Sequence, residues 1–167
     1  MAALVDTRLI TAKMTITYRP LTPADHEFCV RVHHLAMRAY VEPLWGWNEA
    51  LQSQRALESL ARPDAVHEIA LLNEMPLGYL SYEDRPESLF LDELYLHPDH
   101  QAQGHGSAIM SRLIAMAHSR RKPIELSVLT TNPRARRFYE RHGFVVLKTT
   151  TDRIRMRRAT DGSPRAK

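Results

Sequence analysis

Residues 91–113 read LDELYLHPDHQAQGHGSAIMSRL and combine a strand pattern, a glycine turn and a helix pattern in direct succession. Residues alternate between two faces from Leu91 until Pro98 ends the run, as in a half-buried strand. Apolar residues then recur at helical spacing after Gly106, as at Ile109 and Leu113. A glycine turn that opens a helix presents unpaired N–H groups and a positive dipole end, which suits a phosphate or pyrophosphate.

Two common classes of glycine loop do not match this turn. A P-loop requires Lys followed by Ser or Thr after its last glycine, whereas Ser107 directly follows Gly106. The dinucleotide fingerprint requires three glycines, and this turn has two. The remaining pattern, Gln-x-x-Gly-x-Gly from Gln101 onward, resembles the pyrophosphate loop of the GNAT acetyltransferase superfamily, which binds acetyl-CoA.

A second block downstream carries the same resemblance. Residues 132–144, NPRARRFYERHGF, are similar to the family's element N-x-x-A-x-x-x-Y-x-x-x-G-F and follow a predicted strand at 124–129. The two motifs stand in the family's order, and the resemblance extends over residues 16–157. It implies that strand 89–96 and the next strand splay apart, with the pantetheine arm in the gap.

The pattern and the resemblance together predict an α/β (α+β) fold, with a mixed, mostly antiparallel sheet and helices on both faces. Its single domain covers residues 14–158, after an N-terminal extension (1–13) and before a disordered tail (159–167). A loop is expected where Pro43 and Gly46 interrupt the pattern, at 40–48. The expected strands are 16–19, 66–72, 77–83, 89–96, 124–129, 145–149 and 153–158, and the expected helices are 22–39, 49–61, 107–119 and 134–142.

Composition narrows the class of protein. The chain has 167 residues, a net charge of +4 and one cysteine, which fits a single domain in a reducing compartment, so we expect a cytoplasmic protein. No apolar run approaches the ~20 residues of a membrane span. The arginine clusters indicate solvated faces or a basic rim for the phosphates of acetyl-CoA, and no nucleic-acid-binding motif accompanies them. The expected partner is a small-molecule or peptide amine, bound by a monomer or homodimer.

The resemblance implies which residues contact acetyl-CoA. They come from the strand end, the glycine loop and the second block. Instead of binding the cofactor, Asn132 could simply cap a helix, and Arg137 could be a solvated arginine. The expected cofactor-binding residues are Leu94, Tyr95, Leu96, Gln101, Ala102, Gln103, Gly104, His105, Gly106, Ser107, Asn132, Ala135, Arg137 and Phe138.

Two residues are candidates for proton transfer. Amide formation requires a neutral amine, whereas an alkyl amine has a pKa of ~10.4, so a carboxylate that takes its proton is useful. Glu93 is the candidate for this base. Alternatively, Glu93 simply lies at the strand edge or attracts the acceptor by its charge, and an ordered water molecule acts as the base. The resemblance implies that Tyr139 protonates the departing CoA thiolate. Alternatively, Tyr139 only packs between a helix and the sheet.

Four residues of the expected loop are candidates for binding the acceptor, because this loop walls the acceptor cleft in the family: Tyr40, Glu42, Trp45 and Trp47. Aromatic rings beside a glutamate suit a cationic amine, although both tryptophans could instead anchor the loop. His97, His100 and His105 lack the spacing of a zinc site, so no metal is expected. Cys29 lies among apolar residues and is interpreted as a small core residue rather than an acyl-carrying nucleophile.

The leading hypothesis is an acetyl-CoA-dependent N-acetyltransferase that acts by direct transfer in a ternary complex. The alternative is an acyl-CoA-binding regulatory module with the same fold and no turnover. The presence of both Glu93 and Tyr139 favours the enzyme.

Overall fold

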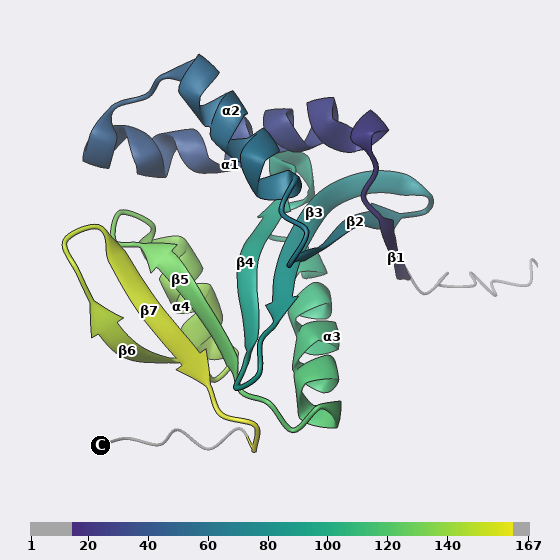
Figure 1. Cartoon of the computed structure of the whole chain (residues 1–167), viewed down its shortest axis with the longest axis vertical. Helices are drawn as coiled ribbons and strands as arrows, with labels where there is room; N and C mark the ends of the chain where they lie inside the picture. Colours follow the sequence, from purple (N-terminus) through teal and green to yellow (C-terminus); the bar gives the residue numbers. More distant parts are fainter. Residues whose placement is uncertain (1–14, 162–167) are drawn as a thin grey trace, which may run out of the picture.

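The computed structural model describes residues 15–161 as one sheet with helices around it (Figure 1). The predicted extension (1–13) and most of the predicted tail lie outside the described residues. The sheet order is β1-β2-β3-β4-β5-β7-β6, and only β4 and β5 run parallel. The predicted mixed, mostly antiparallel sheet is therefore confirmed. The strands are β1 (Ile16–Pro20), β2 (Val66–Leu72), β3 (Met75–Asp84), β4 (Leu89–Leu96), β5 (Ile124–Leu129), β6 (Val145–Thr149) and β7 (Arg153–Arg158).

Helices cover both faces of this sheet. Consecutive residues of a strand point to opposite faces. Tyr79 of β3 therefore lies in the apolar cluster with α1 and α2, while the next residue, Leu80, lies in the cluster with α3 and α4. None of the helices within residues 15–161 is long and apolar enough to cross a membrane. The helices are α1 (His26–Trp45), α2 (Glu49–Leu60), α3 (His105–Ser119) and α4 (Pro133–Arg141), with the short 3-10 helices η1 (Pro23–Asp25) and η2 (Pro98–His100).

Helix α1 continues to Trp45, so the prediction of a loop at 40–48 is wrong for most of that segment. Pro43 removes one N–H donor and crowds the carbonyl of the preceding turn, which usually ends or kinks a helix. Here it falls in the last turn, where few later hydrogen bonds depend on it. Gly46 ends the helix in the left-handed region (φ 71°), and its N–H donates to the carbonyl of Glu42.

Tertiary contacts hold these last turns of α1 in place. Val41 is buried, and the Tyr40 carbonyl accepts a hydrogen bond from the Thr131 hydroxyl of the β5–α4 loop. The Arg153 guanidinium of β7 lies 5.9 Å from the centroid of the Trp45 ring. The end of α1 thus reaches across to the half of the molecule that contains β5, β7 and α4.

Strands β4 and β5 separate, as the resemblance implies. Only Leu89, Phe90 and Leu91 of β4 pair with β5, so the rest of β4 has no strand partner on that side. On its other side, β4 pairs with β3 as far as Leu96, with a register shift at which Asp92 is the extra residue. β-bulges of this kind re-aim side chains and are common beside active sites. The sheet therefore opens next to Asp92.

Candidate active site

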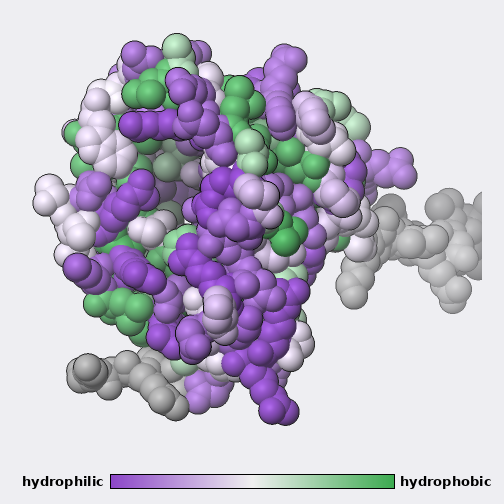
Figure 2. All heavy atoms as spheres, in the orientation of Figure 1, coloured by the Kyte–Doolittle hydropathy of each residue, from purple (hydrophilic) through white to green (hydrophobic). Residues whose placement is uncertain are grey.

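A cleft of about 890 Å³ occupies the opening between β4 and β5. Figure 2 shows the surface hollowed below the end of α1, beside the half of the molecule that contains β5 and β7. The walls come from α1, α2, α4, the glycine loop and the two splayed strands. The structure brings together these sequence-predicted residues at the cleft: Tyr40, Trp45, Glu93, Leu94, Tyr95, Leu96, Gln101, Ala102, Gly104, Gly106, Ser107, Asn132, Ala135, Phe138 and Tyr139.

Three predicted cofactor-binding residues do not line this cleft. The His105 ring is buried, and its Nδ1 lies 3.1 Å from the His100 carbonyl oxygen. The Gln103 amide donates to the Asp99 carbonyl at 2.6 Å, and Arg137 is exposed on α4. His105 and Gln103 therefore shape the loop from within.

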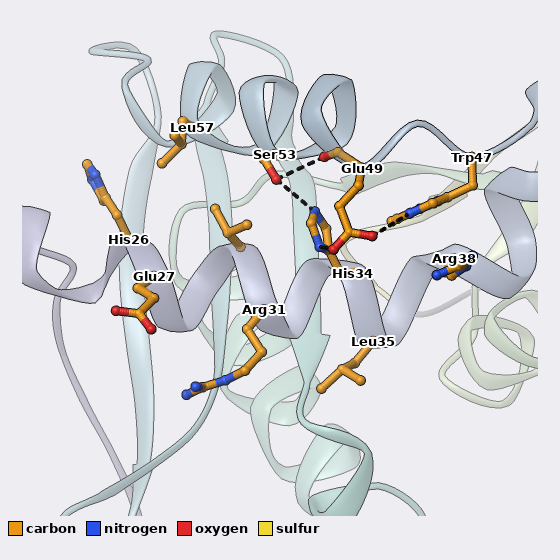
Figure 3. Close-up of a pocket in the computed structure, with 11 residues that line it drawn as sticks. His26, Glu27, Arg31, His34, Leu35, Arg38, Trp47, Glu49, Ser53 and Leu57 are labelled. Atoms are coloured by element: carbon orange, nitrogen blue, oxygen red, sulfur yellow. Dashed lines mark hydrogen bonds and ion pairs between the residues drawn. The ribbon is translucent and has the colours of Figure 1, made fainter.

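Two predicted acceptor residues also lie elsewhere. Glu42 pairs with Arg38 on the surface of α1, at 3.8 Å. Trp47 lines a separate hollow of about 700 Å³ between the outer sides of α1 and α2 (Figure 3). There its ring contacts His34, with 5.3 Å between ring centroids, and its indole N–H donates to Glu49. Because His34 in turn bonds Ser53, the polar groups of this hollow largely satisfy one another.

Glu93 is the most perturbed carboxylate in the cleft. It belongs to the face of β4 that also carries Tyr95, under α1 and α2. Its Oε2 atom is buried without a hydrogen-bond partner among the described residues. Burial, and next the neighbouring charge of Asp92, raise the pKa of Glu93 to about 7. Glu93 therefore exchanges a proton near neutral pH.

The carboxylate of Asp92 is held by Arg62, which follows α2. Arg62 Nη1 donates to Asp92 Oδ2 at 2.8 Å, and the same guanidinium pairs with Glu83 of β3 and Asp64. Burial raises the pKa of Asp92, while Arg62 opposes that change. One arginine thus joins the end of α2 to β3 and to the bulge of β4.

Tyr139 reaches the cleft from the opposite face of the sheet. Its ring packs against Phe138 and Phe144 in the cluster with α3 and α4. Its hydroxyl makes no hydrogen bond within residues 15–161, although the residue lines the cleft. Burial raises the pKa of Tyr139, so its phenol stays protonated at neutral pH. Glu93 and Tyr139 therefore line the same cleft from its two sides.

The glycine loop has the geometry of an anion site. Gly104 caps α3 in the left-handed region (φ 83°), a conformation that favours glycine. At Gly106, a Cβ would make ordinary contacts with the Phe138 ring at 3.5 Å and with Leu96 Cδ1 at 3.8 Å, so the protein itself does not require glycine here. The Gln101 amide nitrogen donates to the Leu96 carbonyl, and its oxygen accepts from Arg134 at 3.0 Å. Arg134 of α4 is thus bonded to the loop that precedes α3, whose first N–H groups suit an anion.

Asn132 acts as the cap of α4. Its Oδ1 accepts the Ala135 N–H at 2.9 Å, which is the helix-cap alternative considered for this residue. Because Asn132 also lines the cleft, its amide nitrogen is left available to a ligand.

Sequence reasoning missed the contribution of α1 and α2 to this cleft. His33, Gln52 and Arg55 line it, together with Arg153 of β7. These residues lie far from both motifs in the sequence. The two arginines carry no signal beyond a general basic pattern. The one available signal is the spacing of Gln52, Arg55 and Ala56, which places these three residues on one side of a helix.

Comparison with known proteins identifies the family. The chain matches the acetyltransferase (GNAT) family over residues 29–144 and belongs to that family. This membership makes it an acyltransferase that transfers acetyl groups. No curated protein matches the chain in sequence.

Solved structures share the fold. An acetyltransferase from Thermus thermophilus has 22% identity and a TM-score of 0.70, covering 87% of this chain and 97% of its own. The PaiA N-acetyltransferase of Thermoplasma acidophilum, in complex with coenzyme A, has 18% identity and a TM-score of 0.70, with 86% and 98% covered. A spermidine N-acetyltransferase chimera from Vibrio cholerae and hSSAT has 18% identity and a TM-score of 0.64, with 87% and 96% covered. Their likeness establishes the architecture.

Proposed function

We propose that the protein transfers an acetyl group from acetyl-CoA to a primary amine, directly and in a ternary complex. The observation that carries this proposal is the meeting of Glu93 and Tyr139 in one cleft, where β4 and β5 part. The two residues belong to opposite faces of the sheet, so each can serve a different bond of the same reaction. The coenzyme A complex of the Thermoplasma relative and the spermidine substrate named for the Vibrio chimera support the donor and acceptor classes.

The residues present fit acetyl-CoA. The first N–H groups of α3, with Gly104 and Gly106, would hold the pyrophosphate, because a helix N-terminus stabilises negative charge. Arg134 adds a positive charge at this end. Past Leu91, the edge of β4 that faces β5 has no strand partner, so its backbone groups are available to the pantetheine amides and the thioester carbonyl.

Glu93 would act as the general base. An amine must lose its proton to become a nucleophile, and a base is most effective when its pKa lies near the working pH. The pKa of about 7 satisfies this condition, whereas an ordinary glutamate would be too weak a base. The buried Oε2 without a partner supports a role in which the acceptor, or a water bound to it, completes the hydrogen bonding.

Tyr139 would act as the general acid. Burial keeps the proton on the Tyr139 hydroxyl at neutral pH, where it is available to the sulfur as negative charge develops there. Acetyl-CoA supplies the acetyl group as a thioester. The acceptor, as the neutral amine, forms the C–N bond as the C–S bond breaks; Glu93 receives the one proton that the nitrogen then loses, and the sulfur receives the Tyr139 proton. Glu93 then releases its proton and the tyrosinate takes one up, which restores both residues. The products are an N-acetyl amine and the free thiol of CoA.

The test is a thiol-release assay with acetyl-CoA and a panel of polyamines, amino acids, aminoglycosides and peptides, with mass spectrometry of the products. We expect a product heavier by one acetyl group, and thiol release that requires both substrates. Calorimetry should show acetyl-CoA binding without an acceptor. Binding without turnover across the whole panel would contradict the proposed function and favour the regulatory module.

A further inference from the structure

The charges that line the cleft are arranged unevenly. Among its described lining residues, the carboxylates are Asp92 and Glu93, which are neighbours on β4. Asp92 is already paired with Arg62. Four arginines line the cleft, and none of them has a carboxylate partner within residues 15–161: Arg134 and Arg141 belong to α4, whereas Arg55 and Arg153 come from α2 and β7. The cleft therefore combines one available acidic group with positive charge that no protein group neutralises.

Arg153 is placed over the cleft by its position on β7. Its side chain and those of Arg155 and Arg157 share one face of that strand, because residues two apart point the same way. Arg155 and Arg157 pair with Glu125, at 2.6 and 3.5 Å. Arg153 instead extends to the Trp45 ring at the end of α1. Of these three arginines, it alone lines the cleft.

Arg55 reaches the cleft from α2. Gln52, Arg55 and Ala56 all line the cleft, and their spacing of three and four residues puts them on one side of the helix. Gln52 and Ala56 are buried on this side and Arg55 is exposed, so Arg55 lies at the rim of the cleft. Arg55 and Arg153 therefore contribute positive charge from two different walls.

Tyr95 lies close enough to both Glu93 and Arg153 for each charge to affect its pKa. Burial, and then the charge of Glu93, raise the pKa of the Tyr95 phenol, while Arg153 lowers it. Both charges therefore act on one hydroxyl. Glu93, Tyr95 and Arg153 all line the cleft, so a ligand bound beside Tyr95 lies near both charges.

We infer that the acceptor is a small amine that also carries a carboxylate, as an amino acid does. The amine would lie at Glu93, and the carboxylate would reach Arg153 and Arg55. Arginine suits this role because its planar fork of N–H donors matches a carboxylate. The same two charges would repel the additional ammonium groups of a polyamine. This inference rests on the proposed N-acetyltransferase function and names its class of acceptor.

The experiment compares matched acceptors. Several amino acids are each compared with their carboxamide and their decarboxylated amine, and spermidine represents polyamines. The value of kcat/KM is expressed per neutral amine, because the three forms differ in amine pKa. We expect the carboxylate form to be preferred by about 10–100-fold, mainly through KM, which is the range for a hydrogen bond between charged groups.

Variants then locate the source of the preference. Arg153→Gln and Arg55→Gln should each reduce the ratio of carboxylate to carboxamide turnover, and the double variant should bring it close to one. Arg155→Gln is the matched control: it removes the same charge from the same face of β7, and Glu125 keeps Arg157 as a partner. It should leave the ratio unchanged. Melting temperatures of all the variants, compared with that of Arg155→Gln, check folding.

The outcomes separate the two proposals. A wild-type enzyme that prefers carboxamides, plain amines or spermidine would overturn the inference while leaving N-acetyl transfer in place. A carboxylate preference that survives in the double variant would also overturn it. An enzyme that acetylates no amine of any class would overturn the proposed function itself, and the inference with it.

Discussion

Replacing Glu93 with glutamine should stabilise the folded protein at alkaline pH. The pKa of Glu93 is about 7 in the folded protein, against its ordinary 4.5. Between these values the folded chain binds more protons than the unfolded chain, so the free energy of unfolding falls as the pH rises. The gap corresponds to about 3 kcal/mol. Glutamine carries no charge to bury and avoids this cost.

The variant should therefore match the wild type in stability below pH 4.5 and exceed it by up to about 3 kcal/mol above pH 7. For a domain of this size, that difference raises Tm by about 6–12 °C. Urea denaturation at pH 4 and pH 8 measures it. Glu87→Gln is the control, because Glu87 is exposed and makes no ion pair or hydrogen bond within residues 15–161. Equal or lower stability of Glu93→Gln at pH 8 would refute the argument from burial.

The same substitution should remove activity. Loss of a general base costs ~10²–10⁴-fold, so we expect kcat/KM at pH 7 to fall by about 10² or more. The wild-type profile should rise with pH through an inflection near 7, which the variant lacks. If Glu93 only attracts a cationic acceptor, the loss will fall in KM and shrink with salt. A pH–rate profile of Glu93→Gln at two salt concentrations decides, and an unchanged profile at both would remove Glu93 from the mechanism.

Three further substitutions test the cleft and the strand beside it. Tyr139→Phe removes one hydroxyl and should lower kcat by ~10–10³-fold, with acetyl-CoA affinity within a few-fold; wild-type turnover would leave only packing. Gly106→Val adds a side chain whose Cβ makes only ordinary contacts with Phe138 and Leu96, so calorimetry should show lost CoA binding while circular dichroism shows a folded protein; retained affinity would contradict the loop assignment. Gly78→Ala would place its Cβ 2.2 Å from the Tyr95 carbonyl oxygen and should cost ~2–3 kcal/mol in urea unfolding, whereas wild-type stability would refute that close contact.

The two motifs were readable from the sequence because each is local. The turn at Gly104 and Gly106 and the cap at Asn132 depend on backbone conformation within a few residues. Six of the seven strands carry an alternating or continuously apolar pattern whose bounds the structure reproduces to within one residue. β3 begins two residues earlier than predicted, because Asn73 and Glu74 both adopt positive φ, which makes a two-residue turn.

The path of α1 was not readable in this way. Pro43 and Gly46 are strong local signals for a loop, yet the helix continues through the proline. The contacts that favour the longer helix come from distant residues, Thr131 and Arg153. Trp47 was expected at the acceptor because it fell in the predicted loop, which walls the acceptor cleft in the family, whereas the structure places it at the hollow on the outer side of α1 and α2.

By itself, the sequence determined the family, the order of elements, the glycine loop and the candidacy of Glu93 and Tyr139, because those properties depend on residue type and short spacing. Only the tertiary structure decided the chemistry of the cleft. The pKa of Glu93 depends on burial under α1 and α2 and on the charge of Asp92 at a bulge. Arg55 and Arg153 contribute positive charge to one cleft only because the fold brings α2 and β7 to the same opening. Electrostatic interactions depend on distance through space, and chain position does not reveal that distance.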